Sequence, residues 1–281
     1  MKLGLVDVGG GMRGIYGAGI MDTCLEENIT FGCCIGVSAG AANMTSFLSG
    51  QRMRSYRYYH EYAFRKEYMG LEHFFKKRSF LNFDYIFGEL CAPDGEDPIA
   101  WDALVKNPAD YLLVASDAEN GSPRYFTRAD MSLGQYRPLA ASCCLPGIDR
   151  PIEIQGRSYF DGALSDPVPL EKAFAEGCDR VVLILTKPSD VRRVPGKDLL
   201  FAKMIHKEFP KAAEQIALRA ERYNAAVDLA MEYQKDGRVL VLAPDDITGV
   251  DTLKRDMDAL DRLYLKGRKD AEKIAPWLKA W

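Results

Sequence analysis

Short apolar runs alternate with segments of helical periodicity from the start of the chain. The first four predicted elements are a buried strand at Leu3–Val8, a helix at Gly14–Glu27, a second buried strand at Gly32–Val37 and a helix at Ala39–Leu48. A chain that alternates strand and helix in this way is typical of an α/β fold.

Further strands are predicted where short runs of β-branched and aromatic residues are bounded by turn residues: Tyr111–Ser116, Arg124–Thr127, Ile152–Tyr159, Arg180–Thr186 and Val239–Leu242. The second and third of these segments have the pattern of local hairpins, whose strands pair antiparallel. We therefore expect a mixed, mainly parallel central sheet.

Helices dominate two other regions of the chain. Residues 51–110 are aromatic and charged, contain few β-branched runs and end in a turn-rich stretch, which predicts a helical insertion. Residues 211–236 predict a long helix that ends before a glycine, and the last thirty residues are helical in pattern. We expect an α/β unit over 1–190 and a helical C-terminal region over 191–281, with one further strand, packed on the same domain.

The composition is that of an ordinary globular protein and excludes several classes. The 281 residues carry 37 Lys and Arg against 40 Asp and Glu, a net charge of −3, which argues against a general nucleic-acid binder. Apolar runs are far shorter than the ~20 residues of a membrane-spanning helix. The N-terminal apolar run is interrupted by Asp7 and does not resemble a signal peptide, so export is not expected.

Cysteine and histidine usage favours a reducing compartment and argues against a metal site. Four of the seven cysteines stand as adjacent pairs in apolar segments: Cys33–Cys34 and Cys143–Cys144. Such cysteines are expected to be buried thiols of a cytoplasmic protein. No C-x-x-C occurs, and the histidines are His60, His73 and His206. We expect no metal and no other cofactor.

A glycine-rich loop, Gly9-Gly10-Gly11-Met12-Arg13-Gly14, joins the first predicted strand to the first helix. Glycines there allow main-chain N–H groups at a helix start to approach a negatively charged oxygen. The loop fits a dinucleotide fingerprint, G-x-G-x-x-G, or an oxyanion hole for acyl transfer. The fingerprint requires an acid at the end of the second strand, and this chain has none there.

The second strand leads instead into Gly36-Val37-Ser38-Ala39-Gly40, a G-x-S-x-G sequence between an apolar strand and an apolar helix. A strand-to-helix elbow of this kind exposes the serine hydroxyl on a tight turn, and small neighbours keep the surrounding backbone clear of it. Ser38 is therefore the candidate nucleophile.

A serine nucleophile needs a base. His206 falls late enough for the serine–acid–histidine order of α/β-hydrolases, but it lies in a predicted helix, and only 37 residues precede Ser38, too few for that fold. A carboxylate can replace histidine if burial raises its pKa and it reaches the hydroxyl. The best candidate is Asp161, which ends an apolar strand and precedes Gly162. Asp166 is the second choice and is more typical of a turn cap.

Together these motifs resemble the patatin-like phospholipases. Three blocks of that family occur in its order: the G-G-G-x-R-G loop, the G-x-S-x-G elbow and D-G-[GA] at Asp161-Gly162-Ala163. Residues 141–147 are similar to the segment before the family's catalytic acid, and the resemblance covers roughly residues 3–186. The chain departs from the family at Asp166-Pro167, where many relatives have Asn-x-Pro.

The resemblance implies a three-layer α/β/α fold and a metal-independent lipid acyl hydrolase with a Ser38–Asp161 dyad. Asp161 would take the Ser38 proton, the serine oxygen would attack an ester carbonyl, and water would release the acyl-enzyme. The expected oxyanion donors are the amides of Gly10, Gly11, Met12 and Ala39. The expected supporting residues are Gly9, Arg13, Gly14, Gly36, Gly40 and Gly162. Arg13 would either polarise the oxyanion or hold the loop through buried hydrogen bonds.

Positive charge and aromatic rings concentrate in residues 52–78. This segment has eight Lys and Arg against three Glu, a net charge of +5, while the rest of the chain carries −8. The pattern suits a cap over the acyl pocket that contacts an anionic membrane. It also suits single-stranded nucleic acid, or a helix packed through its aromatic rings with a solvated basic face. We expect peripheral membrane contact and no nucleic acid.

The sequence thus predicts hydrolysis of a lipid or other acyl ester. Acyl transfer to an alcohol or thiol is the alternative reaction, because the same dyad serves both. A nucleotide-binding module built on the glycine loop, and a catalytically silent lipid-binding protein, are the alternatives from other classes.

Overall fold

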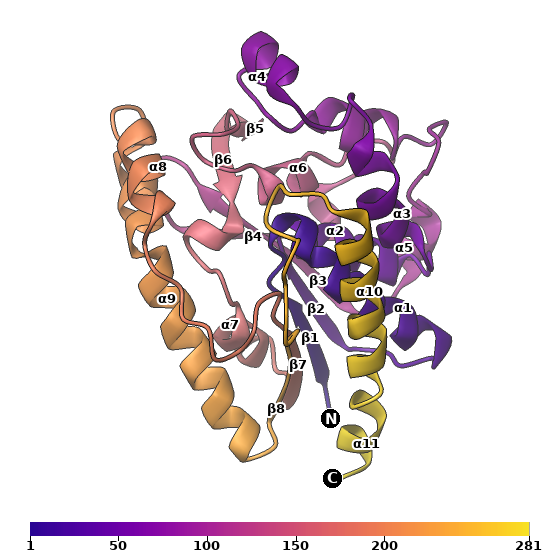
Figure 1. The fold of residues 1–281 in the computed structure, drawn as a ribbon. Coiled ribbons are helices and arrows are strands. Elements are labelled where there is room, and N and C mark those ends of the chain that lie inside the picture. The colour runs from indigo at the N-terminus through magenta and orange to yellow at the C-terminus, as the bar shows by residue number, and fades with distance from the viewer. Residues whose placement is uncertain (281) are drawn as a thin grey trace.

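A mixed sheet of eight strands organises the chain in the computed structural model, which describes residues 1–280 (Figure 1). The strands are β1 (Leu3–Asp7), β2 (Cys33–Val37), β3 (Asp110–Asp117), β4 (Pro123–Phe126), β5 (Ile152–Ile154), β6 (Arg157–Asp161), β7 (Arg180–Ile184) and β8 (Val239–Leu242). Their order is β5-β6-β3-β2-β1-β7-β8, and β4 also pairs with β3. The pairs among β3, β2, β1, β7 and β8 are parallel, and those involving β4, β5 or β6 are antiparallel. The predicted mixed, mainly parallel sheet is confirmed.

Helices cover both faces of the sheet and complete a three-layer α/β/α fold (Figure 1). The α-helices are α1 (Ile15–Glu26), α2 (Ala39–Leu48), α3 (Arg54–His60), α4 (Leu71–Lys77), α5 (Trp101–Lys106), α6 (Arg137–Cys143), α7 (Leu170–Ala175), α8 (Lys197–Ile205), α9 (Pro210–Lys235), α10 (Met257–Ala271) and α11 (Ile274–Lys279). Helices α1, α2 and α10 share one apolar core on the sheet, and α7 and α9 share the other. Alternate strand residues such as Leu5 and Val6 point into the two cores because successive side chains of a strand face opposite sides.

One predicted strand, Ile152–Tyr159, is wrong as a single element. The chain reverses at Gln155 and Gly156, whose φ angles are 51° and 75°, and separates β5 from β6. Positive φ at both central residues is the geometry of a two-residue hairpin turn, usually marked by Asn-Gly or Asp-Gly. Glutamine carries no such signal, so the turn was missed. The second strand of this hairpin ends at Asp161.

The sheet brings the two candidate catalytic residues to the same edge of β3. Strand β4 pairs with β3 over Leu113–Ser116, so β2 and β6 must share the opposite edge of β3. Val37 at the end of β2 is opposite Val114, and Asp161 at the end of β6 is opposite Ala115. Ser38 therefore leaves its strand next to the position where Asp161 leaves its own.

The C-terminal region joins this core through β8 and α10. Strand β8 extends the sheet beside β7, and α10 packs closely on α1. The two helices approach through glycines, since a Cβ atom on Gly19 or Gly267 would collide with main-chain carbonyl oxygens of the facing helix. Within residues 1–280, no helix is both long enough and apolar enough to cross a membrane.

Candidate active site

The glycine loop after β1 has a main-chain conformation that only glycine adopts readily. Gly9, Gly10 and Gly11 have φ angles of +63°, +128° and +60°. A Cβ atom on Gly9 would lie 2.8 Å from the N atom of Gly40 and would collide with the carbonyl oxygen of Val37. The loop therefore packs directly against the turn that carries Ser38.

The turn between β2 and α2 has the strained geometry of a nucleophile elbow. Ser38 has φ 58° and ψ −130°, an unusual conformation for a residue with a side chain. Gly36 and Gly40 have no room for a side chain. A Cβ atom on Gly36 would lie 2.5 Å from the Cα atom of Ala41, and a Cβ atom on Gly40 would lie 2.8 Å from the Cγ atom of Asp7. The Ser38 N–H donates to the Ser142 Oγ atom at 2.9 Å, which fixes the elbow to α6.

Ser38 and Asp161 are buried next to each other. Asp161 is 1% exposed, Ser38 is 8% exposed, and the Ser38 hydroxyl lies near enough to act on the Asp161 carboxyl. Burial raises the pKa of Asp161 to about 6, although the nearby Ser38 hydroxyl and the hydrogen bond from the Ala163 N–H lower it. The Ala163 N–H lies 2.8 Å from the Asp161 Oδ1 atom and orients the carboxylate. With this pKa, the Asp161 carboxyl beside Ser38 is largely ionised at neutral pH.

The glycine loop offers two main-chain donors beside this pair. The N–H groups of Gly10 and Gly11 have no acceptor among the described residues, and Ala39 opens α2, where N–H groups lack helical partners. The Met12 N–H instead donates to the Thr252 carbonyl oxygen at 3.0 Å. This contact removes Met12 from the oxyanion donors expected from the sequence.

Arg13 holds the loop rather than entering the pocket. Its Nη1 atom forms an ion pair with the Asp251 Oδ1 atom at 2.5 Å, and its Nη2 atom would lie 3.1 Å from a Cβ atom on Gly10. Its side chain is 7% exposed and does not line the pocket described below. Arg13 was expected either to polarise the oxyanion or to hold the loop. This geometry favours the second role.

The remaining supporting glycines occur where the chain packs most tightly. A Cβ atom on Gly14 would lie 2.5 Å from the Tyr59 hydroxyl, and one on Gly162 would lie 2.6 Å from the main-chain carbonyl carbon of Val114.

Asp166, the second-choice catalytic acid, is engaged elsewhere, since it accepts a hydrogen bond from the Tyr125 hydroxyl at 2.6 Å.

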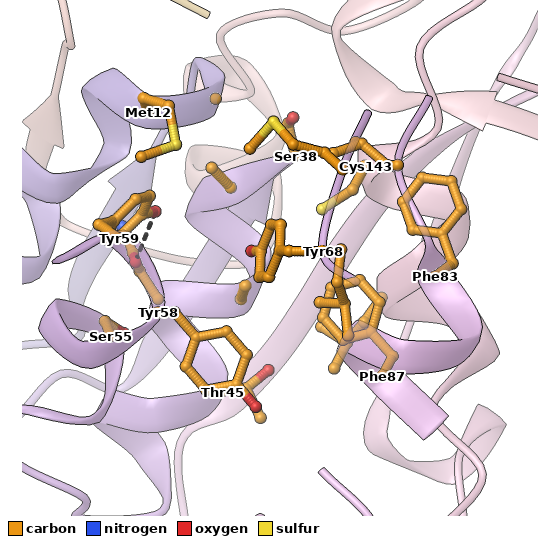
Figure 2. Close-up of a pocket in the computed structure, with 18 of the residues that line it drawn as sticks. Met12, Ser38, Thr45, Ser55, Tyr58, Tyr59, Tyr68, Phe83, Phe87 and Cys143 are labelled. Atoms are coloured by element: carbon orange, nitrogen blue, oxygen red, sulfur yellow. Dashed lines mark hydrogen bonds between the residues drawn. The ribbon is translucent and has the colours of Figure 1, made fainter. Parts of the chain in front are cut away.

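A pocket of about 850 Å³, its open mouth included, contains Ser38 (Figure 2). Its walls are largely apolar and aromatic, and most of its aromatic side chains come from the 51–110 insertion: Tyr58, Tyr59, Tyr68, Phe83 and Phe87. The glycine loop contributes Gly11 and Met12, and α6 contributes Leu139 and Cys143. Such a lining suits a hydrocarbon chain.

Three arginines of the insertion are engaged in ion pairs that the sequence did not reveal. The Arg54 Nε atom lies 3.3 Å from the Asp97 Oδ1 atom, and the Arg57 Nε atom donates to the Asp97 Oδ2 atom at 2.8 Å. Arg65 pairs with Glu96 at 2.5 Å. Asp97 and Arg54 are 5% and 3% exposed. Because these three arginines are neutralised by carboxylates, the basic surface of residues 52–78 is much smaller than the charge count predicted.

Sequence reasoning also missed two residues, Asp7 and Thr186, that hold the start of the glycine loop by hydrogen bonds. Asp7 is fully buried and accepts hydrogen bonds from the Gly9 N–H at 2.9 Å and the Asn43 amide at 3.0 Å. The Thr186 hydroxyl donates to the Gly9 carbonyl oxygen. Asp7 ends β1, and Thr186 lies just beyond the end of the neighbouring strand β7. A polar residue at a strand end is a signal that could have indicated their role.

Comparison with known proteins decides the family. Residues 6–174 match the family model described as Patatin-like phospholipase. The chain belongs to the patatin-like phospholipase family. The match covers the glycine loop, the serine elbow and Asp161. A second model, Domain of unknown function (DUF6363), matches residues 209–281.

Relatives of this patatin-like protein include two kinds of bacterial protein. Uncharacterized protein YjjU of Escherichia coli (strain K12) is 26% identical over 199 residues, which are 69% of this chain and 54% of YjjU. Uncharacterized NTE family protein Rv1063c of Mycobacterium tuberculosis is 27% identical over 96 residues, 34% of this chain and 25% of the relative. The matches thus span about half or less of these relatives. Among solved structures, VipD from Legionella pneumophila aligns with a TM-score of 0.49 at 13% identity, over 97% of this chain and 66% of VipD.

Proposed function

We propose that this patatin-like protein is a serine lipid acyl hydrolase with Ser38 as the nucleophile and Asp161 as the base. One observation carries the proposal: Ser38 opens into an apolar pocket beside a buried carboxylate, next to a glycine loop with two unpaired N–H groups. Family membership supports lipid esters as the substrate class.

The geometry supports a two-step reaction. Asp161 accepts the Ser38 proton while the serine oxygen attacks the ester carbonyl carbon. The carbonyl oxygen becomes an oxyanion that accepts hydrogen bonds from Gly10 and Gly11, with Ala39 at the helix start. When the intermediate collapses, the ester bond breaks and the departing alcohol takes the proton from Asp161. Water then gives a proton to Asp161, attacks the acyl-enzyme and releases the fatty acid and free Ser38.

Turnover by matched variants tests this dyad. We expect Ser38→Ala and Asp161→Asn each to lower kcat on p-nitrophenyl esters and phospholipid vesicles by about 10³-fold or more, because each removes a group that acts in the chemical step. Exposed Ser132→Ala and Asp190→Asn serve as controls that should keep wild-type rates. An active Ser38→Ala enzyme would exclude the mechanism. Transfer of the acyl group to added alcohol, in preference to water, would favour the acyltransferase alternative.

We also propose that α4 contacts an anionic membrane surface. Helix α4 has no buried residue, and its Leu71 and Phe75 side chains are 66% and 79% exposed on one face. Helix α4 projects from the rest of the molecule (Figure 1). Lys76 on α4 and Lys66 shortly before it have side chains 71% and 89% exposed and pair with Glu72 and Glu67. Apolar side chains next to cations match a bilayer surface with anionic headgroups. The seven cysteines are free thiols and six of them are buried, which supports a cytoplasmic setting for this contact.

Vesicle pelleting separates membrane contact from catalysis when all variants carry Ser38→Ala. We expect Leu71→Ser with Phe75→Ser to weaken binding to vesicles that contain phosphatidylserine by about tenfold, since two buried apolar contacts are lost. Leu133→Ser, on another exposed leucine that is 54% exposed, should bind as the parent does. Equal binding by the α4 variant would exclude this surface.

A further inference from the structure

The segment that leads from β8 into α10 crosses the glycine loop of the active site. From the end of β8 it returns to the edge of the sheet where β1 leads into the glycine loop, and α10 begins after that (Figure 1). We call residues 250–255 of this segment the strap. The strap lies within the region matched by the domain of unknown function, outside the patatin-like match.

Main-chain contacts join the strap to the loop. The Met12 N–H donates to the Thr252 carbonyl oxygen at 3.0 Å. A Cβ atom on Gly11 would lie 2.8 Å from the Thr252 carbonyl carbon and would collide with its oxygen. The strap therefore packs against Gly11, one of the two loop residues with an unpaired N–H group. Gly11 must be glycine for this contact as well as for its own conformation.

A charged contact adds to the main-chain contact. Arg13 pairs with Asp251 at 2.5 Å, and its Nη1 atom also donates to the Thr252 hydroxyl at 3.3 Å. The same guanidinium is next to Gly10, 3.1 Å from the position of a Cβ atom there. The strap therefore contacts Gly11 directly through Thr252 and supports Gly10 through Arg13, so it contacts both residues proposed to offer oxyanion donors.

The C-terminal end of the strap is anchored. Arg255 donates to the Ala63 carbonyl oxygen in the insertion, and the Asp256 side chain caps α10 by accepting the Ala259 N–H at 2.9 Å. Helix α10 is itself fixed on α1, where the Tyr16 hydroxyl donates to Asp270 at 2.8 Å. Just before these anchors, Thr252 and Leu253 form part of the pocket wall. The strap is thus held in place as a fixed part of the site.

We propose that the C-terminal region completes the active site through the strap. Asp251 and Thr252 act as positioning residues that hold the glycine loop with the Gly10 and Gly11 N–H groups directed at the oxyanion, and Leu253 bounds the acyl pocket. Donors that are fixed before the reaction stabilise the developing charge without rearrangement. This inference rests on the proposed hydrolase function, and it assigns a role to the region whose function the family models leave open.

Kinetics of the full chain test the strap. We expect Asp251→Asn to lower kcat on a short p-nitrophenyl ester by about tenfold with KM nearly unchanged, because the substrate still binds while the donors are less well placed. Asp251→Glu should restore most of the rate. The matched control is Glu26→Gln, which removes the bidentate pair with Arg268 between α1 and α10, remote from the pocket. That control should lower the thermal midpoint without lowering kcat.

The outcomes are distinct from those that test the dyad. If wild type hydrolyses esters and Ser38→Ala does not, while Asp251→Asn keeps full kcat, the strap has no positioning role. A rise in kcat in Asp251→Asn would show that the strap obstructs the site, which also overturns the proposal. A parallel fall of kcat and thermal midpoint in both Asp251→Asn and Glu26→Gln would reduce the strap to a stabilising contact. Leu253→Ala should in addition shift the preferred acyl length, and an unchanged preference would exclude Leu253 from the pocket.

Discussion

Two adjacent regions, residues 3–48 and residues 51–110, build the same pocket in opposite ways. In the first region, main-chain segments pack so closely that Gly9, Gly36 and Gly40 have no space for a methyl group. In the second, large side chains fill the wall and ion pairs centred on Asp97 hold them. In the proposed hydrolase, this difference separates two properties. The first region is expected to determine whether the reaction occurs, and the second to determine stability and which acyl chain fits.

The largest effect should come from adding one methyl group to the first region. Gly40→Ala places a Cβ atom 2.8 Å from the Asp7 Cγ atom and against the Asp7 carbonyl oxygen, so the elbow and the loop must separate. We expect kcat/KM to fall at least about 100-fold, as for other displacements of about 1 Å in an active site. Gly70→Ala, where a Cβ atom meets nothing within 4 Å, is the control. Full activity of Gly40→Ala would remove the contrast between the two regions.

A loss of stability is the next largest expected effect, and it belongs to the second region. Asp97→Ala leaves the Arg54 guanidinium buried without its carboxylate, which typically costs about 3–5 kcal/mol. Chemical denaturation should show this loss, while the folded fraction keeps a wild-type rate of chemistry on a short ester. The exposed pair of Lys76 and Glu72 is the control, and Glu72→Ala should change stability by less than about 1 kcal/mol. An Asp97→Ala protein as stable as wild type would contradict the role of this ion pair.

The smallest expected effect is a change of selectivity. Phe87→Ala removes an aromatic wall of the pocket without touching Ser38 or the loop. We expect the optimum acyl length to increase, with a change of a few-fold in kcat/KM between short and long esters, because one or two extra methylenes gain contact. If kcat/KM instead fell equally for esters of all acyl lengths, Phe87 would support the catalytic residues rather than select the acyl chain.

The same contrast explains what could be predicted from the sequence. The strand–turn–helix signals around Ser38, and the strand end at Asp161, are local, so the fold class and the candidate dyad were accessible. The Gln155-Gly156 turn lacked the usual turn residues. Contacts between distant residues left no local signal: Arg13 and Asp251 are 238 positions apart, and Asp97 lies outside the segment whose charge was counted. Charge counts describe the chain, and only the fold shows which charges are paired.

The pH dependence of Ser38 labelling by a fluorophosphonate tests the central claim most directly. Asp161 must be ionised to accept the serine proton, and burial raises its pKa to about 6. The labelling rate should therefore be constant above about pH 7 and fall about tenfold per unit below pH 6. Labelling should be confined to Ser38 by peptide mass and be lost in Asp161→Asn. A rate with no inflection near pH 6, or an inflection that His206→Ala removes, would contradict the Ser38–Asp161 dyad.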